Sequence, residues 1–362
     1  EQAGPGDSPL GRRDVETEGI PRLEVVDILP DRGLARFSLS PAQATPRNVF
    51  LSRELVADVL EREGTANVAL SSVAISDDAM NVGLSDLGLS LSRVTKTFEG
   101  ETVFDYYNLT SDRMLVDSSA VDAVTALLPE GTVTPTMTYL ANAIERQDDP
   151  EGLYPVVVYS TVTAVDSAPG LTLNYTTPEE LGDAIPIVLN SWAAERLQAK
   201  KGTRLSVAYF EPEVENGKEM EYFFDAVVTD VVPITRPARR YIRDREAVFD
   251  QLPTRYNDPD LTPAVPGVTD QETIESWGVP FEMTRKVLTE DDDYWRFFRL
   301  TPKAFIPLAE GRRLFSSRFG ETTGLRIDVS VAENAEELEQ RLVGAMNKVL
   351  PELGWTARSI RS

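Results

Sequence analysis

The chain has 362 residues, of which 41% are hydrophobic and 8% aromatic, so it is long enough for two or three globular domains. It has a net charge of −23 and contains neither cysteine nor histidine. These numbers exclude disulfides, Cys/His zinc sites and histidine-based catalysis. The negative charge argues against nucleic acid and anionic lipid surfaces as partners.

Strands and helices are expected to alternate in the first third of the chain, after an arm of Gly, Pro and charged residues at 1–21. The apolar patterns predict strands at Leu23–Leu29, Val49–Leu51 and Asn67–Val73, and a hairpin at Leu91–Phe98 and Val103–Leu109. Helices are predicted from Ser52 to Gly64, weakly over Asp77–Leu89, and from Asp117 or Ser118 onward.

The middle of the chain is predicted to be rich in strands. They are expected at Thr136–Glu145, Tyr154–Val165, Leu205–Tyr209 and Phe224–Val232. The continuous apolar run at Tyr154–Val165 is typical of a strand that is buried on both faces. Between these strands, Asn190 is a suitable N-cap for a helix at Trp192–Ala199.

The carboxy-terminal part contains a predicted β-α-β unit. Ala304–Ile306 is expected to form a strand, Pro307 to start a helix, and Leu325, Ile327 and Val329 to alternate along the next strand. A final helix is predicted by a capping box of Asn334 and Glu337, followed by an apolar stripe of Leu338, Leu342, Met346 and Val349.

A weaker copy of this unit precedes it in the sequence. Thr45-Pro46-Arg47 corresponds to Thr301-Pro302-Lys303, Gly64 to Gly320, and Val25–Pro30 to Val228–Pro233. The shared order predicts an internal duplication. We therefore expect an α+β fold with two related β-α-β-containing repeats, mixed sheets and β-rich insertions. Residues 1–130 would be a partial first repeat with a connector, and residues 131–362 a second repeat with an insertion at 235–300.

Three groups of residues are candidate sites. The acids Glu290–Asp293 could hold a cation or act as an acid pair, but a solvated acidic loop is favoured because contiguous acids point in divergent directions. The arginines could bind a phosphate or a lipid headgroup, or pair with nearby acids: Arg236, Arg239, Arg240, Arg243 and Arg245. The aromatic residues could line a hydrophobic substrate path, or, as we favour, pack in a core: Trp277, Trp295, Phe297 and Phe298.

Enzyme motifs are missing from the sequence. It has no Gly-x-x-x-x-Gly-Lys-Ser/Thr phosphate loop and no Ser-x-x-Lys motif. We therefore assign no catalytic, cofactor-binding or metal-binding residue, and we expect no cofactor and no enzyme activity. No run of about 20 apolar residues and no signal peptide is recognised in the chain.

Several segments together indicate a family. They are Thr138–Ile144, Ile187–Leu197 with Lys201–Leu205, Val228–Pro233, Val265–Asp270 and Asp293–Gly320, with Ser8–Arg13 and Arg36–Gln43 in the first copy. These segments resemble the extracytoplasmic region of large FtsX-like (MacB-type) ABC transporter permeases, which have a long double insertion after the first membrane helix. The resemblance covers most of the chain and is strongest over residues 138–328. The first copy lacks its front half and the membrane helices are absent, so we expect an excised fragment.

The resemblance implies a fold like the MacB-type periplasmic core domain, without catalytic residues. It also implies a domain outside the inner membrane that couples ATP hydrolysis by a cytoplasmic partner subunit to movement of a lipid, lipoprotein or other envelope molecule. The implied partners are the ABC ATPase, reached through the absent membrane helices, and a second permease in a dimer. Two alternatives remain open at this point: a free-standing secreted binding module, and a secreted hydrolase that uses two carboxylates.

Overall fold

The computed structural model describes residues 23–37, 47–59, 63–64, 66–73, 82–149, 151–176, 182–212, 220–241, 247–265, 267–279 and 281–355. The chain divides into two compact units. The described residues up to Val73 belong to the first unit, and those from Val82 onward belong to the second.

The first unit contains one short α-helix, α1 (Arg53–Val59), and a 3-10 turn at Gly33–Arg36. The predicted N-cap is confirmed, because the Ser52 hydroxyl accepts a hydrogen bond of 3.2 Å from the Leu55 amide. The strands predicted at Leu23–Leu29, Val49–Leu51 and Asn67–Val73 are wrong, because these residues have no strand structure.

The physical reason is that a strand is stable only when a neighbouring strand completes its hydrogen bonds. No such ladder forms among the described residues of the first unit. The first of the two predicted β-α-β units is therefore not formed in this part of the chain.

The second unit contains nine strands in one connected sheet, within the residues described. They are β1 (Leu89–Phe98), β2 (Glu101–Ser111), β3 (Val133–Arg146), β4 (Val157–Ala164), β5 (Ile185–Asn190), β6 (Arg204–Phe210), β7 (Glu221–Val232), β8 (Ala304–Ile306) and β9 (Gly324–Asp328). The hairpin turn at Glu99-Gly100 lies between β1 and β2, as the sequence predicts.

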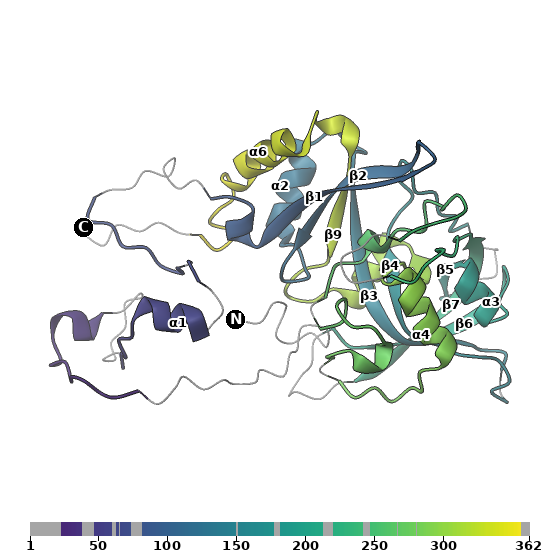
Figure 1. Ribbon diagram of the computed structural model, residues 1–362, viewed down its shortest axis with the longest axis horizontal. Helices are drawn as coiled ribbons and strands as arrows, with labels where there is room; N and C mark the ends of the chain where they lie inside the picture. The colour runs from purple at the N-terminus through teal and green to yellow at the C-terminus, as the bar shows by residue number, and fades with distance from the viewer. Residues whose placement is uncertain are drawn as a thin grey trace. The chain divides into compact units, whose positions relative to one another are not determined.

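Six of these strands close into a mixed barrel in the order β3-β4-β8-β5-β7-β6, because β6 pairs with β3 as well as with β7. The pairs β4–β8 and β5–β7 are parallel, whereas the other pairs of the barrel are antiparallel. The interior is apolar and includes Ile144, Ile187 and Val207. The fold is thus α+β, with a six-stranded barrel as its centre (Figure 1).

The remaining strands extend the sheet beyond the barrel. The first residues of β3, Val133–Thr136, pair with β9, and β9 pairs in turn with β2. One strand therefore belongs to both the barrel and the extension. The strands on the two sides of the predicted division at residue 130 also share one sheet.

The described part of the second unit also contains five α-helices: α2 (Ser118–Leu127), α3 (Ser191–Arg196), α4 (Thr289–Phe298), α5 (Leu308–Phe315) and α6 (Ala335–Met346). The predicted caps are confirmed for three of them. Asp117 accepts from the Ser119 amide, Asn190 from the Ala193 amide and Asn334 from the Glu337 amide. Helices α2 and α6 lie next to each other beside the extension (Figure 1), where Leu338, Leu342 and Met346 are fully buried.

The predicted carboxy-terminal β-α-β unit is formed, but its two strands lie apart in the sheet. β8 lies between β4 and β5, and β9 lies between β2 and β3. The connecting helix α5 places Leu308 and Phe315 in the apolar cluster of the barrel. Its Gly311 is so close to β4 that an added Cβ would lie 2.0 Å from the Cβ of Ala164.

The segment between β7 and α4 covers the outside of the barrel. Ile274, Trp277 and Trp295 from the segment and α4 form an apolar cluster with Leu140 of β3 and Val158 of β4. Across the parts of the chain described, no helix is long and apolar enough to cross a membrane.

Candidate functional site

The four acids Glu290–Asp293 lie at the start of α4, with the first three in its first turn, and not in the solvated loop favoured from the sequence. Carboxylates are stabilised at this end of a helix by the helix dipole. Each acid meets a different partner. Glu290 lies 3.9 Å from Arg196 and Asp293 lies 3.6 Å from Arg240, while Asp291 accepts from the Leu288 amide and Asp292 from the Ile274 amide. The expected divergence of these side chains is confirmed. Groups of three or more acids able to hold a metal do not occur among the described residues.

The arginine cluster lies beside the carboxy-terminal half of α4. The guanidinium of Arg236 lies 4.0 Å from the centre of the Phe297 ring, and Arg240 both contacts this ring at 5.9 Å and pairs with Asp293. Arg236 and Arg239 are exposed and form no ion pair with the described carboxylates. Pairing with acids therefore accounts for Arg240 but not for these two. Arg243 and Arg245 lie outside the described residues.

The aromatic residues proposed for a substrate path lie mainly in a core. The rings of Trp277 and Trp295 meet edge to face with their centres 4.9 Å apart, and both side chains are buried. Phe298 is buried as well and stacks on Tyr294 at 4.7 Å. Phe297 is half-buried beneath Arg236. Core packing, the favoured interpretation, agrees with this burial.

A buried lysine next to α4 was not singled out as a site from the sequence. The Lys303 ammonium lies 4.7 Å from the ring centres of both Trp192 and Tyr294, an arrangement in which the aromatic faces attract the cation. Burial lowers the pKa of Lys303 to about 8, although the nearby Asp291 carboxylate acts in the opposite direction. Burial in turn raises the pKa of Asp291. The signal in the sequence is one lysine directly before the apolar run Ala304–Ile306.

Two small cavities lie between the covering segment and the barrel. The first is lined by Lys303, Asp291 and Trp277 and leaves about 10 Å³ for water-sized molecules, which is space for one water. Oδ1 of Asp291 and Nε1 of Trp277 are buried without a hydrogen-bond partner in the structure. A single water in this cavity would give these polar atoms a partner.

The second cavity is apolar and shares Thr161 and Trp277 with the first. Its walls include Leu140 and Leu300, and it offers about 30 Å³. A lipid chain needs far more room than this, because drug-sized ligands already occupy pockets of about 300 Å³ or more. The described cavities are therefore too small for a lipid.

A second buried polar cluster connects the covering segment to the extension. Asp258 of this segment accepts hydrogen bonds at Oδ2 from Tyr106 of β2, at 2.9 Å, and from Arg326 of β9, at 3.3 Å. The guanidinium of Arg326 also lies 3.8 Å from the Tyr106 ring centre. Burial, followed by the negative charge of Asp260, raises the pKa of Asp258 to about 7, which Arg326 opposes.

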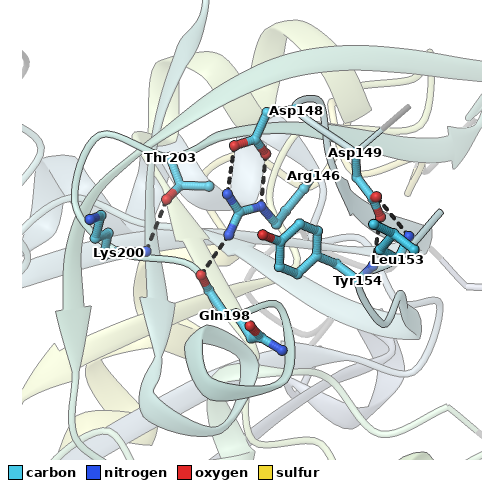
Figure 2. A network of polar contacts seen from close by, with 8 residues as sticks. All are labelled: Arg146, Asp148, Asp149, Leu153, Tyr154, Gln198, Lys200 and Thr203. Carbon is cyan, nitrogen blue, oxygen red and sulfur yellow. Dashed lines mark hydrogen bonds and ion pairs between the residues drawn. The ribbon is translucent and has the colours of Figure 1, made fainter. Parts of the chain in front are cut away.

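A third network lies where β3 ends and meets β6 (Figure 2). Arg146 donates two hydrogen bonds to Asp148, of 2.7 and 2.6 Å, and one of 2.7 Å to the Gln198 carbonyl, while its guanidinium lies 4.1 Å from the Tyr154 ring. These contacts join the β3–β4 connection to the turn after α3, and they fix the barrel at its closure. The two hydrogen bonds to Asp148 pair the charge of Arg146 with a carboxylate two residues away. We therefore interpret this network as structural.

Comparison with known proteins found no match, either to a family model or to a curated protein. The functional conclusion therefore depends on the residues and their arrangement. These show buried polar junctions and small cavities.

Proposed function

We propose that this chain is the non-catalytic extracytoplasmic domain of an FtsX-like (MacB-type) ABC transporter permease. It couples ATP hydrolysis by a cytoplasmic partner subunit to the movement of a lipid, lipoprotein or other envelope molecule. The proposal includes a permease dimer in the inner membrane and a relationship of this fold to the MacB-type periplasmic core domain.

One observation carries the proposal. The segments between Thr138 and Gly320 that resemble these permeases are far apart in the sequence, but they lie in the barrel and its cover. Thr138–Ile144 lies in β3, Ile187–Leu205 contains α3 and parts of β5 and β6, and Asp293–Gly320 contains β8, α5 and most of α4. A resemblance by chance would be expected to fall on unrelated loops as often as on one structural core.

The mechanics of the second unit also favour a coupling role. β3 runs without interruption from the extension into the barrel, and α6 is fixed to the extension by three fully buried side chains. A force applied at α6 would therefore reach the barrel through packed elements. The small cavities favour transmission of movement over the carriage of a lipid inside this domain.

The test is to purify the full polypeptide that contains this sequence from the membranes of its host. We expect it to stay in the membrane fraction after a high-pH wash and to co-purify with an ATP-binding-cassette subunit. Recovery of the polypeptide in the wash, without an ATPase, would contradict the proposal and favour a secreted binding module.

A further inference from the structure

The arginine-rich part of the covering segment forms a loop with two neighbouring arms, residues 235–241 and 247–252, which we call the arginine loop. The Ala238 amide donates a hydrogen bond of 2.7 Å to the Val248 carbonyl, and the Thr235 hydroxyl donates one of 2.8 Å to the Leu252 carbonyl. The loop is also attached to α4, because the Tyr241 amide donates to the Arg296 carbonyl at 2.8 Å. The two arms and α4 thus form one surface.

This surface combines exposed cations with exposed aliphatic side chains. Arg236, Arg239 and Arg240 are exposed on the first arm, while Val248 and Leu252 on the second arm are 49% and 56% exposed. Burying these two aliphatic side chains would be favourable, but nothing in the described part of this unit covers them. Exposed cations next to exposed aliphatic residues are typical of protein surfaces that bind at a lipid–water interface.

The two arms, taken without the acids of α4, have a charge opposite to that of the whole chain. The described residues of the two arms contain three arginines and one aspartate, in a protein with a net charge of −23. Charges farther away than about 8 Å are largely screened at physiological ionic strength. A ligand at the loop is therefore governed by the arginines and the nearest acids, Asp250 and Asp293, and not by the overall charge that argued against anionic lipid.

Two of the arginines are available for a ligand. The Arg240 guanidinium lies 3.6 Å from the Asp293 carboxylate, which offsets part of its positive charge. Arg236 and Arg239 form no ion pair with a described carboxylate. Arg236 is held against the Phe297 ring at 4.0 Å, so less side-chain entropy is lost when its guanidinium binds an anion. A planar guanidinium is well suited to the oxygens of a phosphate.

We propose that the arginine loop docks on the surface of an anionic phospholipid membrane. Arg236 and Arg239 would bind headgroup phosphates, and Val248 and Leu252 would enter the interface. An acidic protein could bind through the arginines alone. The adjacent aliphatic residues therefore favour a lipid as the partner. This interaction surface goes beyond the proposed coupling function and does not depend on it.

The test is flotation of the purified chain with vesicles of phosphatidylglycerol and phosphatidylcholine, or of phosphatidylcholine alone. We expect binding to the anionic vesicles that weakens as salt is raised, and little binding to the neutral ones. Arg236→Ala/Arg239→Ala should lower the affinity about fivefold for each arginine removed. Val248→Ser/Leu252→Ser should lower it on the order of tenfold without any change in charge.

The matched control is Arg113→Ala/Lys348→Ala, which removes the same charge from two exposed positions elsewhere in this unit. It should leave vesicle binding unchanged. Equal losses in the control and the arginine-loop variants would overturn the proposal, because binding would then follow net charge. Binding that withstands the two serine substitutions would also overturn it. So would capture by polyglutamate or by inorganic phosphate in the absence of vesicle binding.

Discussion

The hydroxyl of Tyr106 on β2 donates a hydrogen bond of 2.9 Å to Asp258, which follows it by 152 residues and lies in the covering segment. Both side chains are buried. This contact attaches the cover of the barrel to the sheet extension, together with Arg326 at 3.3 Å. It is the point at which the stability of the cover should respond to pH.

Replacing Asp258 by Asn should change the pH dependence of unfolding. Burial raises the pKa of Asp258 from 3.8 to about 7, so between these values the folded state keeps a proton that the unfolded state has released. The native chain should therefore lose stability relative to Asp258→Asn as pH rises from about 4 to about 7, by roughly 1.4 kcal/mol per pH unit. Urea unfolding at four pH values measures the difference. A difference that does not change with pH would contradict this assignment.

Tyr106→Phe should shift this pH window upward. The hydrogen bond from Tyr106 lowers the pKa of Asp258, so its loss raises that pKa further. The variant should also lose about 1–3 kcal/mol at pH 8, because the buried Asp258 Oδ2 loses one of its two hydrogen bonds and keeps only the one from Arg326. The same urea series measures both effects. An unchanged pH profile would show that the 2.9 Å contact does not influence the carboxyl group.

Lys303→Met should reveal a second titration at higher pH. Burial lowers the pKa of Lys303 from 10.5 to about 8, so above pH 8 the unfolded state binds a proton that the folded state does not. The stability of the native chain should rise relative to Lys303→Met between pH 8 and 9.5. Methionine preserves an apolar stem between Trp192 and Tyr294, which makes it the suitable comparison. A flat difference over this range would exclude a neutral lysine.

Two glycine substitutions test how closely α5 approaches the barrel. Gly311→Ala should cost about 1–3 kcal/mol, because its new methyl group would lie 2.0 Å from the Ala164 Cβ and α5 would have to move. Gly344→Ala in α6 meets nothing within 4 Å and should instead stabilise the chain by up to about 1 kcal/mol. Opposite signs in thermal unfolding are expected. Equal effects would mean that α5 is more loosely packed than described.

The sequence predicts local elements well where the signal is carried by neighbouring residues. The caps at Asp117, Asn190 and Asn334 and the turn at Glu99-Gly100 are of this kind, because a cap is a contact between residues two or three positions apart. The apolar stripe predicted for the final helix is equally local: Leu338, Leu342 and Met346 lie in α6 and are fully buried, whereas Val349 follows the end of the helix.

Contacts between distant residues could not be predicted in the same way. Barrel closure depends on pairing of β3 with β6, which no local pattern specifies. The acids Glu290–Asp293 predict a solvated loop within the insertion, because the sequence alone does not distinguish such a loop from the acidic start of helix α4. The strand predicted at Leu23–Leu29 failed for the opposite reason: the β-prone pattern is present, but the described part of that unit provides no partner strand.

The sequence identifies the arginines and the acids as candidate sites, but it does not show which of them contact each other. The pairing of Arg240 with Asp293 joins residues on different elements. The importance of Asp258 and Lys303 comes from their burial, which depends on the covering segment and cannot be read from either residue's neighbours in sequence.

Leu342→Ala should destabilise the second unit through the loss of buried packing. Leu342 is fully buried between α6 and the extension, and its truncation should cost about 2–5 kcal/mol. The loss should appear in the urea midpoint of the isolated chain. The control is Gly344→Ala, on the exposed side of the same helix, which should not lower the free energy of unfolding.

The ratio of substrate moved to ATP hydrolysed tests the central claim most directly. It would be measured in the reconstituted transporter that contains this chain, at a temperature at which the Leu342→Ala domain remains folded. If α6 and the barrel transmit force as one body, Leu342→Ala should lower this ratio severalfold while the ATPase rate persists, and Gly344→Ala should leave the ratio unchanged. An unchanged ratio in Leu342→Ala, with the domain folded and its α6 packing weakened, would contradict a coupling role for this chain.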